Sequence, residues 1–383
     1  MKVYPHNVMT IKQENRALIF HYFRKGPTSR TEISKLSSLS KSAVTMIINE
    51  LIEEGQIKEI GTTPSIRGRE TVLLDIVPDY KYAAGIALHR NYVYVCLTDL
   101  KSNIVAYSNH SISKWNDPYS VLDFAIKEIK RFLKKLKISK EKCIGIGVSA
   151  PGPLDYVSGT ILNPPDFELF HNVKIAEYIK EKIGLPVMLD NNAVLLAMQE
   201  YISREDFGYK NSMFVVVSDG IGSAITTSGQ IYRGSGGFAG ELGHTSIHSG
   251  GIKCSCGNVG CLEKYITVRA LKNKFGFESY ESLVDDAYMG DDKAKQIMEY
   301  IADEFSYAII NAVNMFDLDG VIIYGEFSYK YEMLQSLLQE RVDKHSVVKR
   351  NHDVKIDFSG MPSNISKASA CAAVINRYFE QKI

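Results

Sequence analysis

Three cysteines and one histidine have the spacing of a metal site. Cys254, Cys256 and Cys261 lie within eight residues, and His244 lies ten residues before the first of them. Thiolate and imidazole groups are typical ligands of tetrahedral Zn²⁺, and four protein ligands leave no open coordination position for catalysis. We therefore predict a structural zinc site. The alternative is a tight loop that holds free thiols.

The N-terminal seventy residues predict a small helical unit with a two-stranded hairpin. Apolar spacing predicts helices over residues 10–23 and 40–52, with a short helix after Ser29 or Thr31 between them. Strands follow over residues 57–60 and 71–76. This is the order of a winged helix-turn-helix, in which the start of the third helix reaches base edges in the major groove.

Small polar and basic residues occur where such a unit would contact DNA. Ser40 predicts the N-cap of the third helix. Cationic and hydroxyl side chains at this helix start can form hydrogen bonds with base edges. Arginines in the hairpin loop can contact phosphates or the minor groove. The predicted DNA contacts are Ser40, Lys41, Ser42, Thr45, Arg67 and Arg69. The alternative is a three-helix protein-interaction module with a solvated polar face.

Charge and composition agree with a nucleic-acid module on a separate body. Residues 1–70 carry eleven Lys and Arg against seven Asp and Glu, whereas the remaining residues carry 34 against 37. Hydrophobic residues make up 45% of the chain and charged residues 23%, which excludes a disordered chain. No apolar run approaches the ~18 residues of a membrane span. We expect a cytoplasmic protein without a membrane partner.

The body, residues 80–383, predicts a duplicated α/β fold. Three strands over residues 82–110 are followed by alternating helices and strands, and a second set begins at residue 213 and includes a helix over 302–316. This arrangement is typical of the two-lobed actin and sugar-kinase (ribonuclease H-like) fold, which binds ligands between its lobes. We therefore expect a DNA-binding domain over residues 1–76 and a ligand-binding domain over 80–383, with the zinc site in the second lobe.

The segment Ile231–Glu263 resembles the signature of the ROK family, which comprises repressors, open reading frames and sugar kinases. The resemblance covers most of residues 80–383, and the N-terminal unit resembles its repressor branch, such as the xylose-type repressors. It implies sugar contacts at Asn163, Glu241, His244 and Glu263. Carboxylate, amide and imidazole groups exchange hydrogen bonds with hydroxyl groups. His244 can serve both sites, because each ring nitrogen can bind a different partner.

The sequence departs from the kinases of this family at the catalytic position. Asn192 stands where they have an aspartate base, beside Asn191. An amide cannot accept the proton of a sugar hydroxyl, and losing a base costs about 10²–10⁴ in rate. Both asparagines are expected to contact the sugar, or else only to cap the next helix. The phosphate and adenosine segments also depart from the family pattern, at Ala87, His89, Arg90, Asp219, Tyr324 and Glu326.

These observations favour a sugar-responsive transcriptional repressor that is not an enzyme. Its expected partners are operator DNA and a sugar or sugar derivative, and its expected assembly is a homodimer or a dimer of dimers. The first alternative is an active ATP-dependent sugar kinase with a fused DNA-binding domain. The second is a ligand-independent DNA-binding or scaffold protein whose sugar pocket has decayed.

Overall fold

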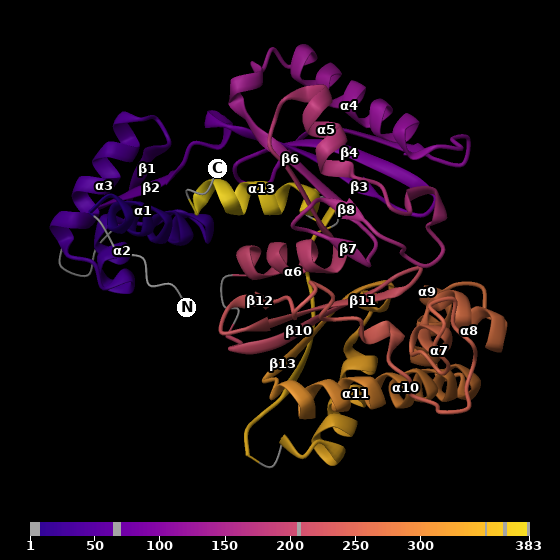
Figure 1. The fold of residues 1–383 in the computed structure, drawn as a ribbon. Helices are drawn as coiled ribbons and strands as arrows, with labels where there is room; N and C mark the ends of the chain where they lie inside the picture. Colours follow the sequence, from indigo (N-terminus) through magenta and orange to yellow (C-terminus); the bar gives the residue numbers. More distant parts are fainter. Residues whose placement is uncertain (1–7, 64–69, 205–207, 349–350, 363–365, 381–383) are drawn as a thin grey trace.

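The computed structural model describes residues 8–63, 70–204, 208–348, 351–362 and 366–380. An N-terminal unit lies beside two α/β lobes (Figure 1). Within the described ranges, no helix has the length and hydrophobicity that a membrane crossing requires.

The N-terminal unit contains the three helices and the hairpin expected from the sequence. They are α1 (Val8–Arg24), α2 (Arg30–Ser37), α3 (Lys41–Glu53), β1 (Ile57–Thr63) and β2 (Thr71–Ile76). Ser38 adopts φ 60° at the end of α2, which turns the chain sharply into α3. The Ser40 hydroxyl then caps α3 by accepting a hydrogen bond from the Ala43 amide at 3.2 Å. Arg16 of α1 connects this helix to the end of α3 by donating hydrogen bonds of 3.0 and 2.6 Å to the Glu54 carboxylate.

The first lobe is built on a five-stranded sheet of order β5-β4-β3-β6-β9. The three strands β3, β4 and β5 pair antiparallel, and β6 and β9 join parallel to β3. Their bounds are Tyr82–Leu88, Tyr92–Asp99, Ile104–Ser111, Cys143–Ala150 and Val187–Asn191. A small hairpin, β7 (Leu154–Asp155) and β8 (Thr160–Ile161), follows β6. Helices α4 (Pro118–Lys135) and α5 (Ile175–Ile183) share the core on one face of this sheet.

The second lobe repeats this topology, which confirms the predicted duplication. Its sheet has the order β12-β11-β10-β13-β14, again with three antiparallel strands followed by two parallel ones. The strands are β10 (Asn211–Val217), β11 (Ile221–Thr227), β12 (Gln230–Tyr232), β13 (Gly320–Gly325) and β14 (Lys355–Phe358). The accompanying helices are α7 (Glu263–Ile266), α8 (Val268–Phe275), α9 (Tyr280–Tyr288), α10 (Asp292–Phe316) and α11 (Glu332–His345). Helix α10 begins ten residues before the predicted start, because Asp291 caps it.

The last helix, α13 (Ser369–Phe379), joins the N-terminal unit to the first lobe (Figure 1). It packs on the face of the first sheet opposite α4, where a Cβ on Gly147 would lie 1.6 Å from the Ala370 carbonyl oxygen. Its other end contacts α1, with the Phe20 and Phe379 ring centroids 4.9 Å apart. One apolar cluster therefore includes residues of α1, α3, the first sheet and α13.

Helix α6 (Asn192–Ser203) lies between the two sheets (Figure 1). Val194 and Ala197 pack into a cluster with Phe214 and Ala224 of the second sheet. The helix follows β9 of the first sheet directly and also contacts α13. Both lobes and the last helix thus meet at α6.

Candidate functional site

The four predicted metal ligands converge at the start of the second lobe's helical region. One ligand atom from each of His244, Cys254, Cys256 and Cys261 lies within 4.8 Å of the others. His244 Nδ1 is 3.7 Å from Cys254 Sγ, and Cys256 Sγ is 3.7 Å from Cys261 Sγ. A tetrahedral ion with zinc–sulfur bonds of about 2.3 Å separates its ligands by about 3.8 Å. The cluster therefore has the dimensions of a four-coordinate metal site.

The loop that carries the cysteines is held by hydrogen bonds and by a close backbone approach. The Cys254 amide donates to the Asn258 carbonyl at 2.8 Å, and the Asn258 side chain donates to the His244 carbonyl at 2.9 Å. Gly260 has a φ of 79°, and a Cβ there would lie 1.9 Å from the His248 carbonyl oxygen. The loop thus requires glycine at this position to bring Cys261 against His244.

A cavity of about 520 Å³ opens next to the cluster, between the lobes. Asn163, which follows β8 of the first lobe, lines it from one side, and Glu241 and His244 line it from the other. His244 Nδ1 faces the Cys254 thiol, which leaves Nε2 as the ring nitrogen available to the cavity. This volume is typical of a small-molecule site.

The Glu241 carboxyl lies in an electrostatically unusual position. The pKa of this carboxyl is raised above its ordinary value. Desolvation in the cleft is the largest cause, His244 opposes it, and the nearby Glu263 carboxylate adds to it. The side chain remains open to the cavity, so a ligand hydroxyl can reach it. A carboxylate in this setting is a strong hydrogen-bond acceptor for a neutral polyhydroxylated ligand.

Sequence reasoning missed other residues that line the same cavity. Glu168, His171 and Phe238 add an acid, an imidazole and an aromatic face. His171 Nε2 lies 2.9 Å from the Pro164 carbonyl oxygen, so the ring is held against the segment that carries Asn163. The only signal in the sequence was the position of Glu168 and His171 just after that segment.

The two asparagines and Glu263 lie beside this cavity rather than in its lining. The Asn191 and Asn192 side-chain oxygens each lie 2.8 Å from the Ala193 amide, so both serve the start of α6. The Asn191 amide nitrogen is near Gly152, a lining residue. Glu263 Oε1 lies 3.5 Å from Cys254 Sγ and 3.9 Å from His244 Nδ1, against the metal cluster.

The segments that depart from the phosphate pattern of the family carry charged and aromatic groups that contact other parts of the chain. Arg90 Nη2 reaches the Pro165 carbonyl oxygen at 3.4 Å, and the same guanidinium flanks Gly220 of the second lobe. The His89 ring stacks on Tyr92 at 4.2 Å, and burial lowers its pKa to about 4 despite the opposing effect of Asp219. Bare backbone amides are what cradle a phosphate, and here the Arg90 guanidinium lies beside Gly220.

The predicted DNA contacts in the third helix lie on its open side. Lys41, Ser42 and Thr45 are exposed, whereas Val44 and Ile48 are buried in the core of the unit. The Ser40 hydroxyl is 3.0 Å from that of Ser42. Arg67 and Arg69 fall outside the residues that the structure describes, so their predicted roles stay predictions.

An ion pair bridges the lobes next to the cleft. Asp190, at the end of β9, receives two bonds of 2.7 Å from Arg233, which follows β12. The Arg233 guanidinium also lies 4.4 Å from the centre of the Tyr156 ring in the first lobe. Asp190 is 5% exposed, so this pair is a partly buried fixed contact between the lobes.

Comparison with known proteins places these features in one family. The ROK family description matches residues 83–366. The chain is 30% identical to a xylose repressor of Caldicellulosiruptor bescii, over 97% of both chains, and 28% identical to an N-acetylglucosamine repressor of Escherichia coli O157:H7, over 89% of this chain and 87% of that protein. A solved ROK family transcriptional regulator, described as a homolog of the E. coli MLC protein, superimposes with a TM-score of 0.79 at 24% identity and covers 97% of each chain.

The match of the family description to most of the two lobes, together with relatives that span the N-terminal unit as well, establishes the assignment. The resemblance of the sequence to the ROK family is thereby confirmed, and the chain belongs to this family.

Proposed function

We propose that this protein is a sugar-responsive transcriptional repressor. Residues 1–76 bind operator DNA as a winged helix-turn-helix, and residues 80–383 bind the sugar or sugar derivative that controls this binding. The observation that carries the proposal is the meeting of Asn163, Glu241 and His244 around one interlobe cavity in a chain that also has an exposed polar helix start at Lys41. The full-length relatives named as repressors support it.

The sugar contacts that we propose are Asn163, Glu241 and His244 in the lining and Asn191, Asn192 and Glu263 beside it. A sugar that pulls the lobes together would bring this second set within reach. Asn191 and Asn192 accept from the amide at the start of α6, so their amide groups are already oriented by the helix start. The acid and imidazole at Glu168 and His171 add further hydroxyl partners.

Zn²⁺ is the metal that we propose for the cluster of His244, Cys254, Cys256 and Cys261. Three thiolates and one imidazole favour zinc over hard cations, and all four ligands come from the protein, which is typical of a structural site. When bound, zinc supplies a fixed cross-link between the ligands. The chain's own contribution is to hold His244 Nδ1 towards the metal, so that the ring orientation towards the sugar cavity is set by the cluster.

The signal from sugar to DNA has a physical route through α6. Its start, at Asn191 and Asn192, lies beside the sugar cavity. Its twelve residues extend about 18 Å at about 1.5 Å per residue. Its other end lies next to α1 and α13, the helices that join the N-terminal unit to the body. A shift of α6 on lobe closure would therefore reach the DNA-binding unit, and a coupling of about 1–3 kcal/mol suffices for a response.

We propose a homodimer, or a dimer of such dimers, as the DNA-binding species, because a palindromic operator requires two-fold symmetry. Helix α10 offers a surface for this contact. Tyr307 is 52% exposed and Met315 is 75% exposed on it, whereas Val313 is buried in the core. Val313 therefore packs in the core. The exposed side chains of Tyr307 and Met315 are available for an interface between subunits.

Lys41→Ala is expected to weaken operator binding by about tenfold or more, because it removes a cation from the groove-facing start of α3. Fluorescence anisotropy with a DNA fragment selected by the protein itself measures the dissociation constant. Lys127→Ala, an exposed lysine on α4, is the matched control and should bind as the wild type does. Equal affinity of Lys41→Ala and wild type would remove the groove assignment.

The competing function is an active ATP-dependent sugar kinase. Asn192→Asp restores the carboxylate of the family's catalytic position, yet we expect no sugar phosphate above background from this variant with MgATP. The reason is that Arg90 and Asp219 remain where phosphates would lie. Sugar binding by calorimetry shows that the variant is folded. Phosphorylation by the single variant would mean that the nucleotide side is intact, and phosphorylation by the wild type would mean that the protein is a kinase.

A further inference from the structure

An exposed methionine lies on the polar side of α3. Met46 is 53% exposed, whereas Val44, Ile47 and Ile48 of the same helix are buried in the core of the N-terminal unit. Methionine is among the residue types that proteins most often bury. A single exposed apolar side chain is nevertheless ordinary on a protein surface. The meaning of Met46 therefore depends on the side chains that surround it.

Met46 lies in the middle of a stripe of exposed side chains. Ser42 lies four residues before it, Thr45 directly before it and Asn49 three residues after it, and all of these side chains are exposed. Residues three and four apart share one side of a helix. The stripe begins next to the cap at Ser40. Met46 thus lies within the first two turns of α3, the part of a recognition helix that reaches base edges.

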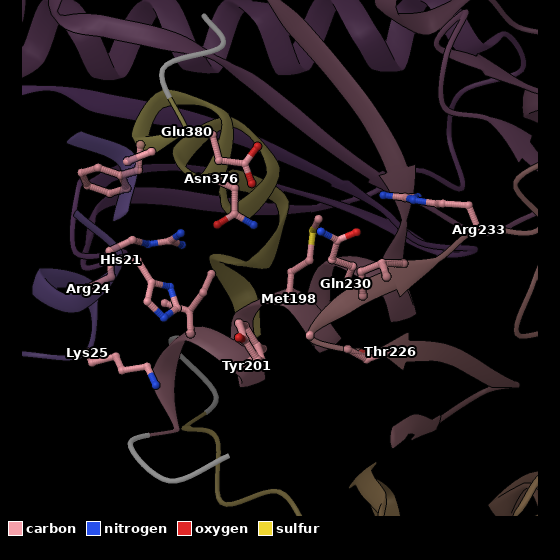
Figure 2. A pocket seen from close by; sticks show the side chains of 15 residues that line it. His21, Arg24, Lys25, Met198, Tyr201, Thr226, Gln230, Arg233, Asn376 and Glu380 are labelled. Carbon is pink, nitrogen blue, oxygen red and sulfur yellow. The ribbon is translucent and has the colours of Figure 1, made fainter. Parts of the chain in front are cut away.

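The contact between the N-terminal unit and the body uses another helix. Figure 2 shows His21, Arg24 and Lys25 projecting from α1 towards a cavity that α6 and α13 also line. The unit therefore meets the body through α1. The stripe on α3 stays exposed with the body present, so another molecule can reach it.

Asn49, the last residue of the stripe, is held by a contact within the unit. Arg30 of α2 donates to the Asn49 side-chain oxygen at 3.0 Å, and the Arg30 guanidinium also lies 3.7 Å from the Glu59 carboxylate. An asparagine that reads adenine uses both its oxygen and its nitrogen. Here the oxygen is bonded to Arg30. Base recognition on this stripe is therefore expected from the residues that precede Asn49.

These preceding residues differ in how sharply they distinguish one base from another. The hydroxyl groups of Ser42 and Thr45 can donate or accept, so they suit several base edges. The Met46 side chain has no hydrogen-bond donor, and its thioether is a weak acceptor. The apolar group that a base pair presents in the major groove is the 5-methyl of thymine. A flexible, unbranched methionine suits a small apolar target of this kind.

We propose that Met46 is a specificity-determining residue of the DNA-binding unit, and that it recognises a thymine by packing against its 5-methyl group. The inference rests on the proposed function, because it requires that α3 enter the major groove of operator DNA. In a two-fold dimer, each half-site contains such a thymine at the same position.

Replacement of thymine by deoxyuridine tests the inference, because it removes only the methyl group. The full-length protein first selects its operator from random DNA, and each thymine of the selected fragment is then replaced in turn. Fluorescence anisotropy measures the dissociation constant. At one thymine in each half-site, we expect the replacement to raise the dissociation constant by about fourfold, which corresponds to the loss of one buried methyl group.

Variants assign this effect to Met46. Met46→Ala should bind the unmodified operator about fourfold more weakly, and deoxyuridine at the assigned thymine should cause no further loss. Met46→Leu keeps an apolar side chain and should keep the dependence on the methyl group. Met289→Ala removes a methionine that is 87% exposed at the end of α9, and this control should behave as the wild type does.

The outcomes separate the inference from the proposed function. If the protein selects no DNA sequence, the proposed function is wrong and the inference is wrong with it. If the protein selects an operator that shows no dependence on thymine methyl groups, Met46 does not recognise thymine. The same conclusion holds if Met46→Ala and the wild type depend equally on every methyl group. In both of these cases the proposed function stands.

Discussion

Glu241→Ala is expected to abolish the sugar response of this protein while leaving DNA binding intact. The variant should bind operator with the wild-type dissociation constant, and the sugar that releases the wild type should no longer release it. The two sites are separate, because Glu241 lines the interlobe cavity and the exposed start of α3 belongs to the N-terminal unit. Removing the acceptor of a charged hydrogen bond costs about 1.5–3 kcal/mol, which weakens sugar binding about 10- to 150-fold.

The measurement is anisotropy of labelled operator DNA, titrated with D-xylose and with N-acetylglucosamine, the sugars in the names of the two repressor relatives. Glu181→Ala removes an exposed carboxylate from α5 and is the matched control. It should respond as the wild type does. If Glu241→Ala still releases DNA at the wild-type sugar concentration, Glu241 has no role in sugar binding.

Zinc removal is the second change with a large expected effect. Cys261→Ser should lose about one zinc ion per chain and unfold at a temperature lower by on the order of 10 °C, because the cross-link among His244 and the cysteines is lost. Cys261 is fully buried between the loop and α7, so the surrounding chain cannot compensate. The sugar response should also weaken, since the same cluster orients the His244 ring.

Zinc content by elemental analysis and thermal unfolding, each with and without a chelator, tests this effect. The chelator should lower the unfolding temperature of the wild type but not of Cys261→Ser. Cys143→Ala removes a buried thiol of the first lobe, and this variant is expected to keep its zinc.

Burial and the adjacent thiols raise the pKa of Cys261 to about 12 without metal. Zinc must therefore displace protons, and its affinity should rise with pH. Protein purified without chelator and free of zinc would contradict the site.

Local patterns predicted much of the fold, because they are set by neighbouring residues. The helix cap at Ser40, the strand Tyr82–Leu88 and the repeated order of strands and helices follow from spacing and turn residues. The start of α10 was wrong by ten residues, because Asp291 caps a polar first turn that carries little apolar signal. The metal cluster was predictable, since its four ligands lie close together in the sequence.

Contacts between distant segments were beyond the reach of the sequence. His171 and Phe238 line one cavity although they lie 67 positions apart in the sequence, because the first lobe carries one residue and the second lobe carries the other. The same holds for Phe20 and Phe379, whose contact connects the first helix to the last. Asn191 and Asn192 illustrate a different limit, because one side chain can cap a helix and also lie beside a ligand site.

The central claim is that a sugar, acting without ATP, controls DNA binding by this chain. Its most direct test is the operator dissociation constant of the full-length protein in a titration with D-xylose and with N-acetylglucosamine, each with and without MgATP, while ADP is measured in the same samples. We predict that one sugar raises the dissociation constant by tenfold or more, equally with and without MgATP, and that no ADP forms above background. Sugar-dependent ADP formation, or release of DNA only when MgATP is present, would contradict the account.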